Sequence, residues 1–188
     1  MASQRYRILA PNAVTAANVA AGFLSMVAAA EERFEVGVYL LVLAVTLDML
    51  DGVVARMLDA TSEFGQELDS FSDALSFGAA PALLLYLACL RGHGLLGLLA
   101  VVVYLLAAIT RLTRFNLRSD AHAKERKTDG VPVPVAAGYM MATVLMRDHI
   151  PWTVAVVVPL VFALLMISHL RLPNLKGRNV VTATMLVG

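Results

Sequence analysis

Four aspartates at helical spacing interrupt a long apolar stretch of this chain and constrain what it can fold into. Asp48 and Asp51 lie in one apolar segment, and Asp69 and Asp73 lie in the next. An aspartate at the centre of a membrane helix costs about 3 kcal/mol, so four uncompensated ones would cost at most on the order of 10 kcal/mol. Clustered carboxylate oxygens are hard ligands, and the pattern therefore predicts a site for Mg²⁺ or Mn²⁺.

The composition indicates a membrane protein. Of the 188 residues, 59% are hydrophobic, and the mean hydropathy is positive, which is more apolar than a soluble domain of this length. Most of the apolar segments reach the ~20 residues that span a bilayer. The six segments run from Pro11 to Ala30, Val36 to Met57, Phe64 to Leu90, Leu95 to Leu117, Val133 to Met146 and Trp152 to Leu170. We expect an all-α, polytopic six-helix bundle formed by one domain over residues 1–188, with no nucleic-acid partner.

Basic residues predict the orientation of the bundle, because cytoplasmic loops carry an excess of Lys and Arg. With the N-terminus in the cytoplasm, only Arg33, Arg91 and Arg147 fall outside. The cytoplasmic residues are then Arg5, Arg7, Arg56, Arg111, Arg114, Arg118, Lys124, Arg126, Lys127, Arg171, Lys176 and Arg178. Six spans place both termini in the cytoplasm, and the aspartate segment opens on the cytoplasmic face of the inner cell membrane.

The N-terminus has an alternative interpretation as a cleaved signal peptide. Arg5 and Arg7 precede an apolar stretch that ends in three alanines, which is the pattern of such a peptide. Asn12, Thr15 and Asn18 interrupt the apolar stretch. These polar residues suit a pocket inside a membrane protein better than the core of a signal peptide.

The spacing of the aspartates predicts that they converge. At about 100° per residue, Asp48 and Asp51 fall on one face of a helix, and Asp69 and Asp73 fall on one face of the next. A short polar connection separates the two helices, so they form an antiparallel hairpin whose acidic faces can meet. The pair of faces predicts a metal site with four carboxylates.

Small residues and one cation accompany the aspartates. Gly52 and Ala55 share the face of the first pair, and Gly65 shares the face of the second. Their small side chains would let a bulky ligand approach the backbone, although small residues also serve simply as helix contacts. Arg56 is placed to meet an anion.

The whole segment matches D-x2-D-G-x2-A-R-x8-G-x3-D-x3-D at all eight fixed positions. It therefore resembles the CDP-alcohol phosphotransferases, in which this motif lies on spans two and three of a six-helix membrane core. The resemblance implies two divalent ions, a homodimer, and transfer chemistry at phosphorus. The implied metal ligands are Asp48, Asp51 and Asp69, with Asp73 as ligand or general base. The implied CDP-binding residues are Gly52, Ala55, Arg56 and Gly65.

Four other stretches resemble the membrane-embedded phosphatidylserine synthases of that family. They are P-N-A-V-T-A-A-N in the first span, A-L-S-F-G-A-A-P-A-L after Asp73, R-L-T-R-F-N-L at the end of the fourth span, and V-P-V-P-V-A-A-G in the fifth. Thr113 stands where alanine is usual, and V-P-V-P stands where G-L-P-x-P is commoner. The resemblance implies CDP-diacylglycerol and L-serine as substrates and adds Thr15 and Asn18 to the CDP site.

A serine acceptor needs polar groups for its ammonium and carboxylate in an otherwise apolar site. Arg111 and Arg114 recur at helical spacing and can hold a phosphate or a carboxylate. Ser70 and Ser76, together with Ser72, can contact the same substrate. The alternatives are that the arginines anchor the helix at lipid headgroups, and that the serines bond back to their own backbone.

Other functions stay open from the residues alone. Glycerol 3-phosphate or an inositol phosphate could replace serine, and an archaeal-type lipid backbone would leave the same headgroup pattern. Glycerophosphate-using relatives commonly carry a lysine after the last motif aspartate, whereas this chain has Ala74. An ion-coupled transporter also uses intramembrane aspartates, but its sites typically lie near the membrane midplane on interrupted helices.

The charge distribution generates a topology prediction. In a Cys89→Ala background, which removes the single native cysteine, cysteine reporters at Ser62 and His122 should react only from the cytoplasmic side. A reporter at His93 should react only from the other side. Labelling by a membrane-impermeant maleimide in intact cells and inverted vesicles measures this, and reversed labelling would invert the site. An N-terminus that begins at Glu31 would show that the first span is a removed signal.

Overall fold

The computed structural model is all-helical over the residues it describes, which are 2–58, 63–121 and 130–168. The helices of the first half are α1 (Ala2–Ala30), α2 (Phe34–Leu58), α3 (Glu63–Asp73), η1 (Ala74–Ala79), α4 (Ala80–Leu85) and η2 (Tyr86–Leu90). The second half contains α5 (Gly94–Ala121), α6 (Val133–Leu145) and α7 (Trp152–Ile167). Elements α3 to η2 form one continuous rod, which we call the third span.

Four of these rods are long and apolar enough to cross a membrane, and they match the first four expected segments. Their apolar windows are Pro11–Ala30, Phe34–Val54, Phe64–Leu90 and Gly94–Leu117. Helices α6 and α7 have 13 and 16 residues, so they extend only about 20 and 24 Å and are short for a full span. The first four of the six expected spans are therefore confirmed by length and composition, whereas the count of six remains a prediction.

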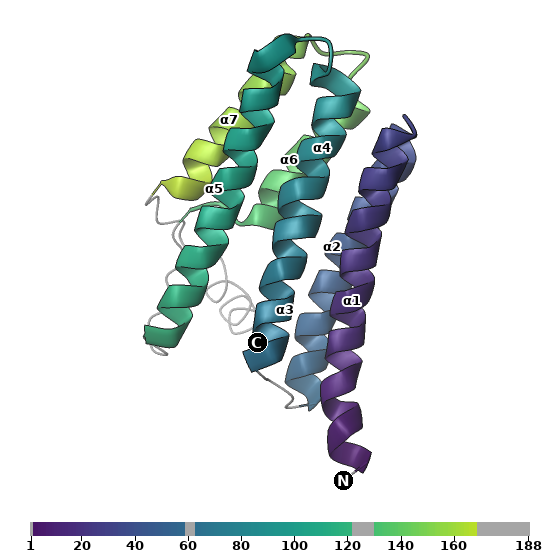
Figure 1. Cartoon of the computed structure of the whole chain (residues 1–188), viewed down its shortest axis with the longest axis vertical. Coiled ribbons are helices and arrows are strands. Elements are labelled where there is room, and N and C mark those ends of the chain that lie inside the picture. The colour runs from purple at the N-terminus through teal and green to yellow at the C-terminus, as the bar shows by residue number, and fades with distance from the viewer. Residues whose placement is uncertain (1, 59–62, 122–129, 169–188) are drawn as a thin grey trace, which may run out of the picture.

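The helices run up and down in one bundle. Helix α1 packs along α2, the third span lies beside that pair, and α5, α6 and α7 complete the other side (Figure 1). Helix α5 continues to Ala121, so the start of the polar stretch 118–130 is helical, and residues 122–129 lie outside the described part. Of the residues expected on the cytoplasmic side, Lys124, Arg126, Lys127, Arg171, Lys176 and Arg178 also lie outside it, as does the reporter position Ser62.

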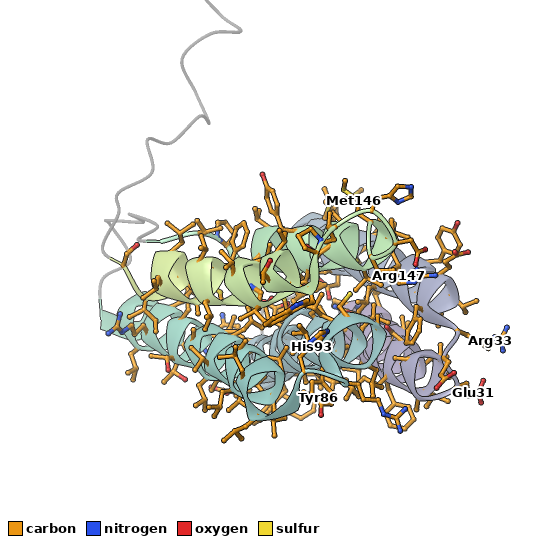
Figure 2. The ribbon with its side chains drawn as sticks, turned by 90° about the horizontal axis from the view of Figure 1, so that it is seen from above. Glu31, Arg33, Tyr86, His93, Met146 and Arg147 are labelled. Atoms are coloured by element: carbon orange, nitrogen blue, oxygen red, sulfur yellow. The ribbon has the colours of Figure 1, made fainter. Side chains whose placement is uncertain are left out.

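Three turns gather at the end of the bundle opposite the N-terminus (Figure 1). They carry Arg33, Arg91 and Arg147, the three arginines that the charge pattern assigned to a single side, and Figure 2 labels two of them at this end. Arg91 lies 3.7 Å from Glu32 of the α1–α2 turn, and Arg147 lies 3.8 Å from Glu35. We call this region the turn end of the bundle, and the opposite region the aspartate end.

Glycines allow the third span to approach the first two helices closely. A Cβ added to Gly22 of α1 would overlap Ser76, and one added to Gly37 of α2 would lie 2.8 Å from Leu84. The Ser25 hydroxyl of α1 donates to the Gly37 carbonyl at 2.8 Å. Small residues at helix contacts are the usual means of tight packing between membrane helices.

The third span is not a regular α-helix, and Pro81 is part of the reason. Immediately after Asp73 the chain widens into the π-helical segment η1, in which the Ala80 N–H bonds to the Leu75 carbonyl five residues earlier. Pro81 has no N–H, so the Phe77 carbonyl four residues before it loses its usual helical donor. The hydroxyl of Tyr104, on α5, donates to that carbonyl at 2.8 Å. The helix is thus distorted next to Pro81, and α5 supplies a hydrogen bond to the Phe77 carbonyl.

This contact generates a stability prediction. Tyr104 is fully buried, so Tyr104→Phe removes the interhelical hydrogen bond to the Phe77 carbonyl in an apolar environment. We expect a loss of about 1 kcal/mol in the free energy of unfolding. Thermal unfolding in detergent measures it, with Tyr139→Phe as the matched control because the Tyr139 side chain is exposed. Equal stability of the two variants would show that the Tyr104 hydroxyl contributes nothing.

Candidate active site

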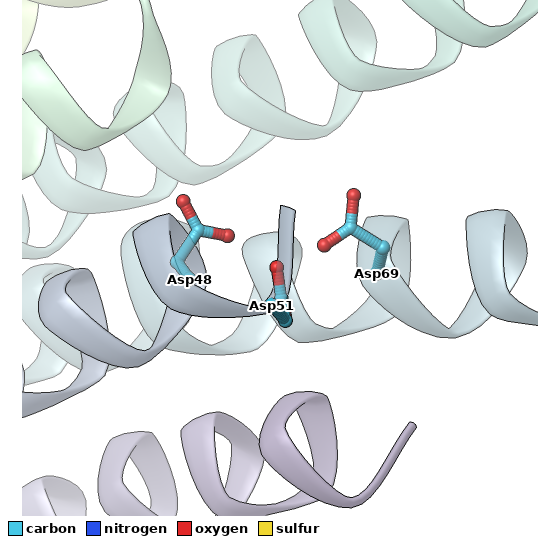
Figure 3. Close-up of side chains that lie close together, drawn as sticks. All are labelled: Asp48, Asp51 and Asp69. Carbon is cyan, nitrogen blue, oxygen red and sulfur yellow. The ribbon is translucent and has the colours of Figure 1, made fainter. Parts of the chain in front are cut away.

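Three carboxyl groups converge at the aspartate end of the bundle. Asp48 and Asp51 come from α2 and Asp69 comes from α3, and one oxygen of each lies within 4.8 Å of the others. Figure 3 shows the three groups turned toward a common space. Asp51 is buried and Asp48 is half-buried. The prediction that the two acidic faces meet is therefore confirmed for these three residues.

Asp73 lies one turn further along the third span and does not belong to the group of three. Its carboxyl group is close enough to that of Asp48 for the two to share a hydrogen bond. Its Oδ1 atom is buried and has no hydrogen-bond partner. An acceptor oxygen left unpaired beside other carboxylates suits a group that binds a cation or takes up a proton.

The site fits a divalent cation. Mg²⁺ and Mn²⁺ prefer carboxylate oxygens, and the cluster provides three converging carboxylates with a fourth beside them. Without a cation, the mutual repulsion of these groups and their removal from water would oppose folding. The donor set and the unpaired oxygen of Asp73 therefore agree with the metal predicted from the sequence.

Thr15 contacts the cluster directly. Its hydroxyl lies 3.0 Å from Oδ2 of Asp51, where it can donate, and 3.1 Å from the carbonyl of Pro11 in its own helix. Both Thr15 and Asp51 are buried. The sequence resemblance placed Thr15 in the CDP site and did not anticipate this contact. The geometry gives Thr15 an additional role, which is to fix the orientation of one carboxylate.

Unpaired polar atoms surround the same region. Among the described residues, the buried side-chain atoms without a hydrogen-bond partner belong to Asn18, Ser72, Asp73 and Arg111. Asn18 is fully buried, and its backbone carbonyl accepts a hydrogen bond from Ser76 on η1. Because buried polar groups are nearly always paired in folded proteins, their concentration here indicates a place built to receive polar ligands.

The two arginines of α5 have different surroundings. Arg111 is half-buried, lies close enough to Asp73 for an electrostatic interaction, and has an unpaired Nε. Arg114 is exposed, and its guanidinium donates to the Ile167 carbonyl at the end of α7, at 3.2 Å. The sequence treated the two alike, but only Arg111 is turned toward the aspartates.

The remaining predicted residues occupy the same end of the bundle with varied surroundings. Gly52 and Gly65 are partly exposed on α2 and α3, while Ala55 and Arg56 lie in the last turns of α2 and their side chains are outside the described part. Ser70 donates back to Gln66 in its own helix, as the alternative interpretation of the serines expected. It also accepts a hydrogen bond from Asn116 of α5 at 2.8 Å.

Asn116 was not predicted as a site residue, although it lies in the R-L-T-R-F-N-L stretch. Its Nδ2 links α5 to the residue that follows Asp69. The signal was present in the R-F-N stretch, where an asparagine interrupts apolar sequence. Only the packing of α5 against the third span reveals what it contacts.

Comparisons with known proteins agree with this site. A family model described as CDP-alcohol phosphatidyltransferase matches residues 8–174. A CDP-diacylglycerol–serine O-phosphatidyltransferase of Helicobacter pylori is 32% identical over 174 residues, which cover 89% of this chain and 73% of the relative. One of Bacillus subtilis is 30% identical over 166 residues, which cover 88% and 90%. An archaetidylserine synthase of Methanothermobacter thermautotrophicus is 32% identical over 178 residues, which cover 94% and 74%. No solved structure gives a significant match.

The contact between Thr15 and Asp51 generates a prediction about metal affinity. Thr15→Val keeps the shape of the side chain and removes the hydroxyl, so Asp51 loses its orienting donor. Loss of such an outer partner typically costs 10–100-fold in metal affinity or activity. We expect the Mn²⁺ concentration for half-maximal activity to rise at least tenfold, with Thr15→Ser close to the wild type. Identical metal dependence in all three proteins would remove Thr15 from this role.

Proposed function

The chain belongs to the CDP-alcohol phosphatidyltransferase family, and we propose that it transfers a phosphatidyl group from CDP-diacylglycerol to L-serine, releasing CMP. The observation that carries the proposal is the similarity, over most of the chain, to several relatives named for that reaction. The convergence of Asp48, Asp51 and Asp69 supports the same chemistry, since these residues are fixed positions of the family motif. The chain is an integral membrane protein, as its four long apolar helices and its family indicate.

We propose that Asp48, Asp51, Asp69 and Asp73 hold two divalent ions, Mg²⁺ or Mn²⁺. When bound, such ions stabilise the negative charge that develops on the phosphate oxygens and on the leaving group. Asp51 would be held in place by Thr15, whereas Asp73 lies close enough to Arg111 for an electrostatic interaction. The aspartates thus have distinct surroundings, which supports a metal-binding role for some of them and a general-base role for Asp73.

Asp73 is the proposed general base. The serine hydroxyl oxygen forms a bond to the phosphorus that carries the diacylglycerol, the bond from that phosphorus to CMP breaks, and the hydroxyl proton passes to Asp73. The unpaired, buried Oδ1 of Asp73 supports this assignment because it is an acceptor without a competing donor.

The nucleotide half of the substrate would lie along the small residues of α2 and α3. Gly52, Ala55 and Gly65 leave space for it, and Arg56 would pair with the diphosphate. Thr15 and Asn18 of α1 complete the proposed CDP site, and the unpaired amide of Asn18 supports a polar ligand there. This places the donor substrate between α1, α2 and α3.

The acceptor would lie on the α5 side of the cluster. Arg111 is the proposed partner of the serine carboxylate, because it combines an unpaired nitrogen with proximity to Asp73. Arg114 would not contact the acceptor directly. It would hold the end of α7 through the Ile167 carbonyl or bind lipid phosphates. Ser70 is proposed to line the same space, with Asn116 orienting it. Ser76 is also proposed to contact the acceptor, although its hydroxyl donates to the Asn18 carbonyl on the α1 side.

The cellular arrangement follows the charge pattern. We propose a single domain with six spans in the inner cell membrane, with both termini and the active site on the cytoplasmic side. The family resemblance supports a homodimer. The grouping of Arg33, Arg91 and Arg147 at the turn end supports this orientation, because these residues are the minority on the opposite side.

An acceptor panel tests the proposal. Purified protein is incubated with CDP-diacylglycerol, Mn²⁺ or Mg²⁺, and L-serine, glycerol 3-phosphate or an inositol phosphate, and the lipid product and CMP are measured. We expect L-serine to have at least a tenfold higher kcat/KM, about 1.4 kcal/mol in transition-state binding. The neutral Ala74 after Asp73 supports an acceptor without a phosphate.

Controls separate the possible failures of the proposal. Asp73→Asn should remain folded in detergent and lose turnover, because it keeps the shape and loses the base. Preference for glycerol 3-phosphate would refute serine as the acceptor, but the proposed transfer of a phosphatidyl group would still hold. Absence of CMP with every acceptor, together with cation uptake by proteoliposomes, would favour the transporter. The similarity to an archaetidylserine synthase raises the question of which lipid backbone the donor carries, and an archaeal-type CDP-lipid in the same assay answers it.

A further inference from the structure

A second polar pocket lies at the turn end of the bundle, far from the aspartates. Its volume is about 300 Å³, and it opens between the η2–α5 turn and the α6–α7 turn. The residues that give it chemical character are Cys89, His93, Arg147, Asp148 and Trp152. None of them belongs to the proposed active site. Figure 2 labels His93 and Arg147 on these neighbouring turns.

Arg147 is the main feature of the pocket. Its guanidinium lies over the Phe34 ring, 5.6 Å from the ring centre, and two carboxylates lie within 4 Å of it, but few of its N–H donors are hydrogen-bonded. Its side chain is 26% exposed, and its one hydrogen bond within the described residues goes to the Val144 carbonyl at 3.3 Å. Glu35 and Asp148 lie 3.8 and 3.9 Å away, beyond ordinary hydrogen-bond distance. A guanidinium has five N–H donors, and the bond to Val144 uses one of them, so an anionic oxygen can still be bound at its edge.

The same pocket also contains groups that can bind a positively charged ligand group. The rings of His93 and Trp152 are stacked with centroids 4.4 Å apart and form an aromatic wall. Asp148 is largely exposed beside it. Aromatic rings and a carboxylate together suit an ammonium group. The pocket therefore offers a place for a negative group at Arg147 and a place for a positive group a short distance away.

The position of the pocket indicates where such a ligand comes from. In a membrane protein, the end of a bundle lies at the level of the lipid headgroups, and tryptophan is enriched there. Phospholipid headgroups that combine a phosphodiester with an amine carry both charges at this depth. Headgroups without an amine would meet Glu35 and Asp148 with no compensating positive charge.

We propose that this pocket binds the headgroup of a zwitterionic, phosphatidylethanolamine-type phospholipid from the membrane leaflet opposite the active site. Arg147 contacts the phosphodiester, and Asp148 and the Trp152 ring receive the ammonium. The ligand bridges the turn before α5 and the turn before α7, so it ties together two helices that contact each other. The proposal does not depend on which acceptor the active site uses.

The single tryptophan of the chain makes the proposal directly measurable. Trp152 lines the pocket, so its fluorescence in the purified full-length protein reports on binding there. Short-chain phosphatidylethanolamine should give a saturable change in the emission of Trp152. Phosphatidylglycerol should bind at least tenfold more weakly, and soluble phosphoethanolamine should give no saturable change at the same concentrations.

Variants identify the groups that act. Arg147→Gln should abolish the saturable change, and Asp148→Asn, at a largely exposed position, should reduce the preference for phosphatidylethanolamine to less than threefold. Arg33→Gln is the matched control, because Arg33 lies at the same end outside the pocket. Thermal unfolding in detergent checks that each variant is folded.

Several results would overturn the proposal. These are the absence of any saturable change in the wild type, equal binding of the two lipids, or an unchanged response in both pocket variants. Binding of phosphoethanolamine as tight as that of the lipid would assign the pocket to a soluble phosphoamine instead. If Arg147→Gln does not fold, the Asp148→Asn and Arg33→Gln comparison still decides the outcome.

Discussion

The electrostatic cost of carboxylates inside an apolar bundle is the constraint on which the rest of this structure depends. One oxygen from each of Asp48, Asp51 and Asp69 lies within 4.8 Å of the others, so their charges repel one another, and Asp51 is buried as well. Polar side chains of the neighbouring helices lie next to these carboxylates. Thr15 of α1 reaches Asp51, and Arg111 of α5 lies near Asp73. Polar groups of α1 and α5 thus flank the carboxylates of α2 and the third span.

The helical period explains why much of the fold and site could be predicted from the sequence. Asp48 and Asp51 are three residues apart, so any helix presents them on one face, and a short connection leaves the next helix antiparallel beside it. The apolar window of the third span, Phe64–Leu90, agrees with the expected segment because composition alone determines it. Asp73, four residues after Asp69, was expected within the metal group, and the structure places it at the edge beside Asp48.

Features that depend on contacts between distant segments could not be predicted in this way. The hydrogen bond from Tyr104 to Phe77 joins residues 27 positions apart, and nothing local in either segment indicates the other. The same holds for Asn116 and Ser70, which are 46 positions apart. Arg111 and Arg114 look equivalent in sequence, but the end of α7 presents a free carbonyl to only one of them. Such differences arise from the packing of helices and not from their periodicity.

The division of the aspartates between two spans has a consequence for the order in which the chain enters the membrane. Helices α1 and α2 are synthesised first, and within that pair Asp51 already meets the hydroxyl of Thr15. The carboxyl neighbours of Asp48 across the site, Asp69 and Asp73, arrive only with the third span, and Arg111 arrives with α5. Until the third span is made, the first hairpin carries Asp48 without the carboxyl groups that would share a cation with it, and a hydrated position of this helix end then costs least. The proposed metal site can therefore be complete only after the third span has entered the membrane, and a chain truncated after α2 would lack two of its four carboxylates.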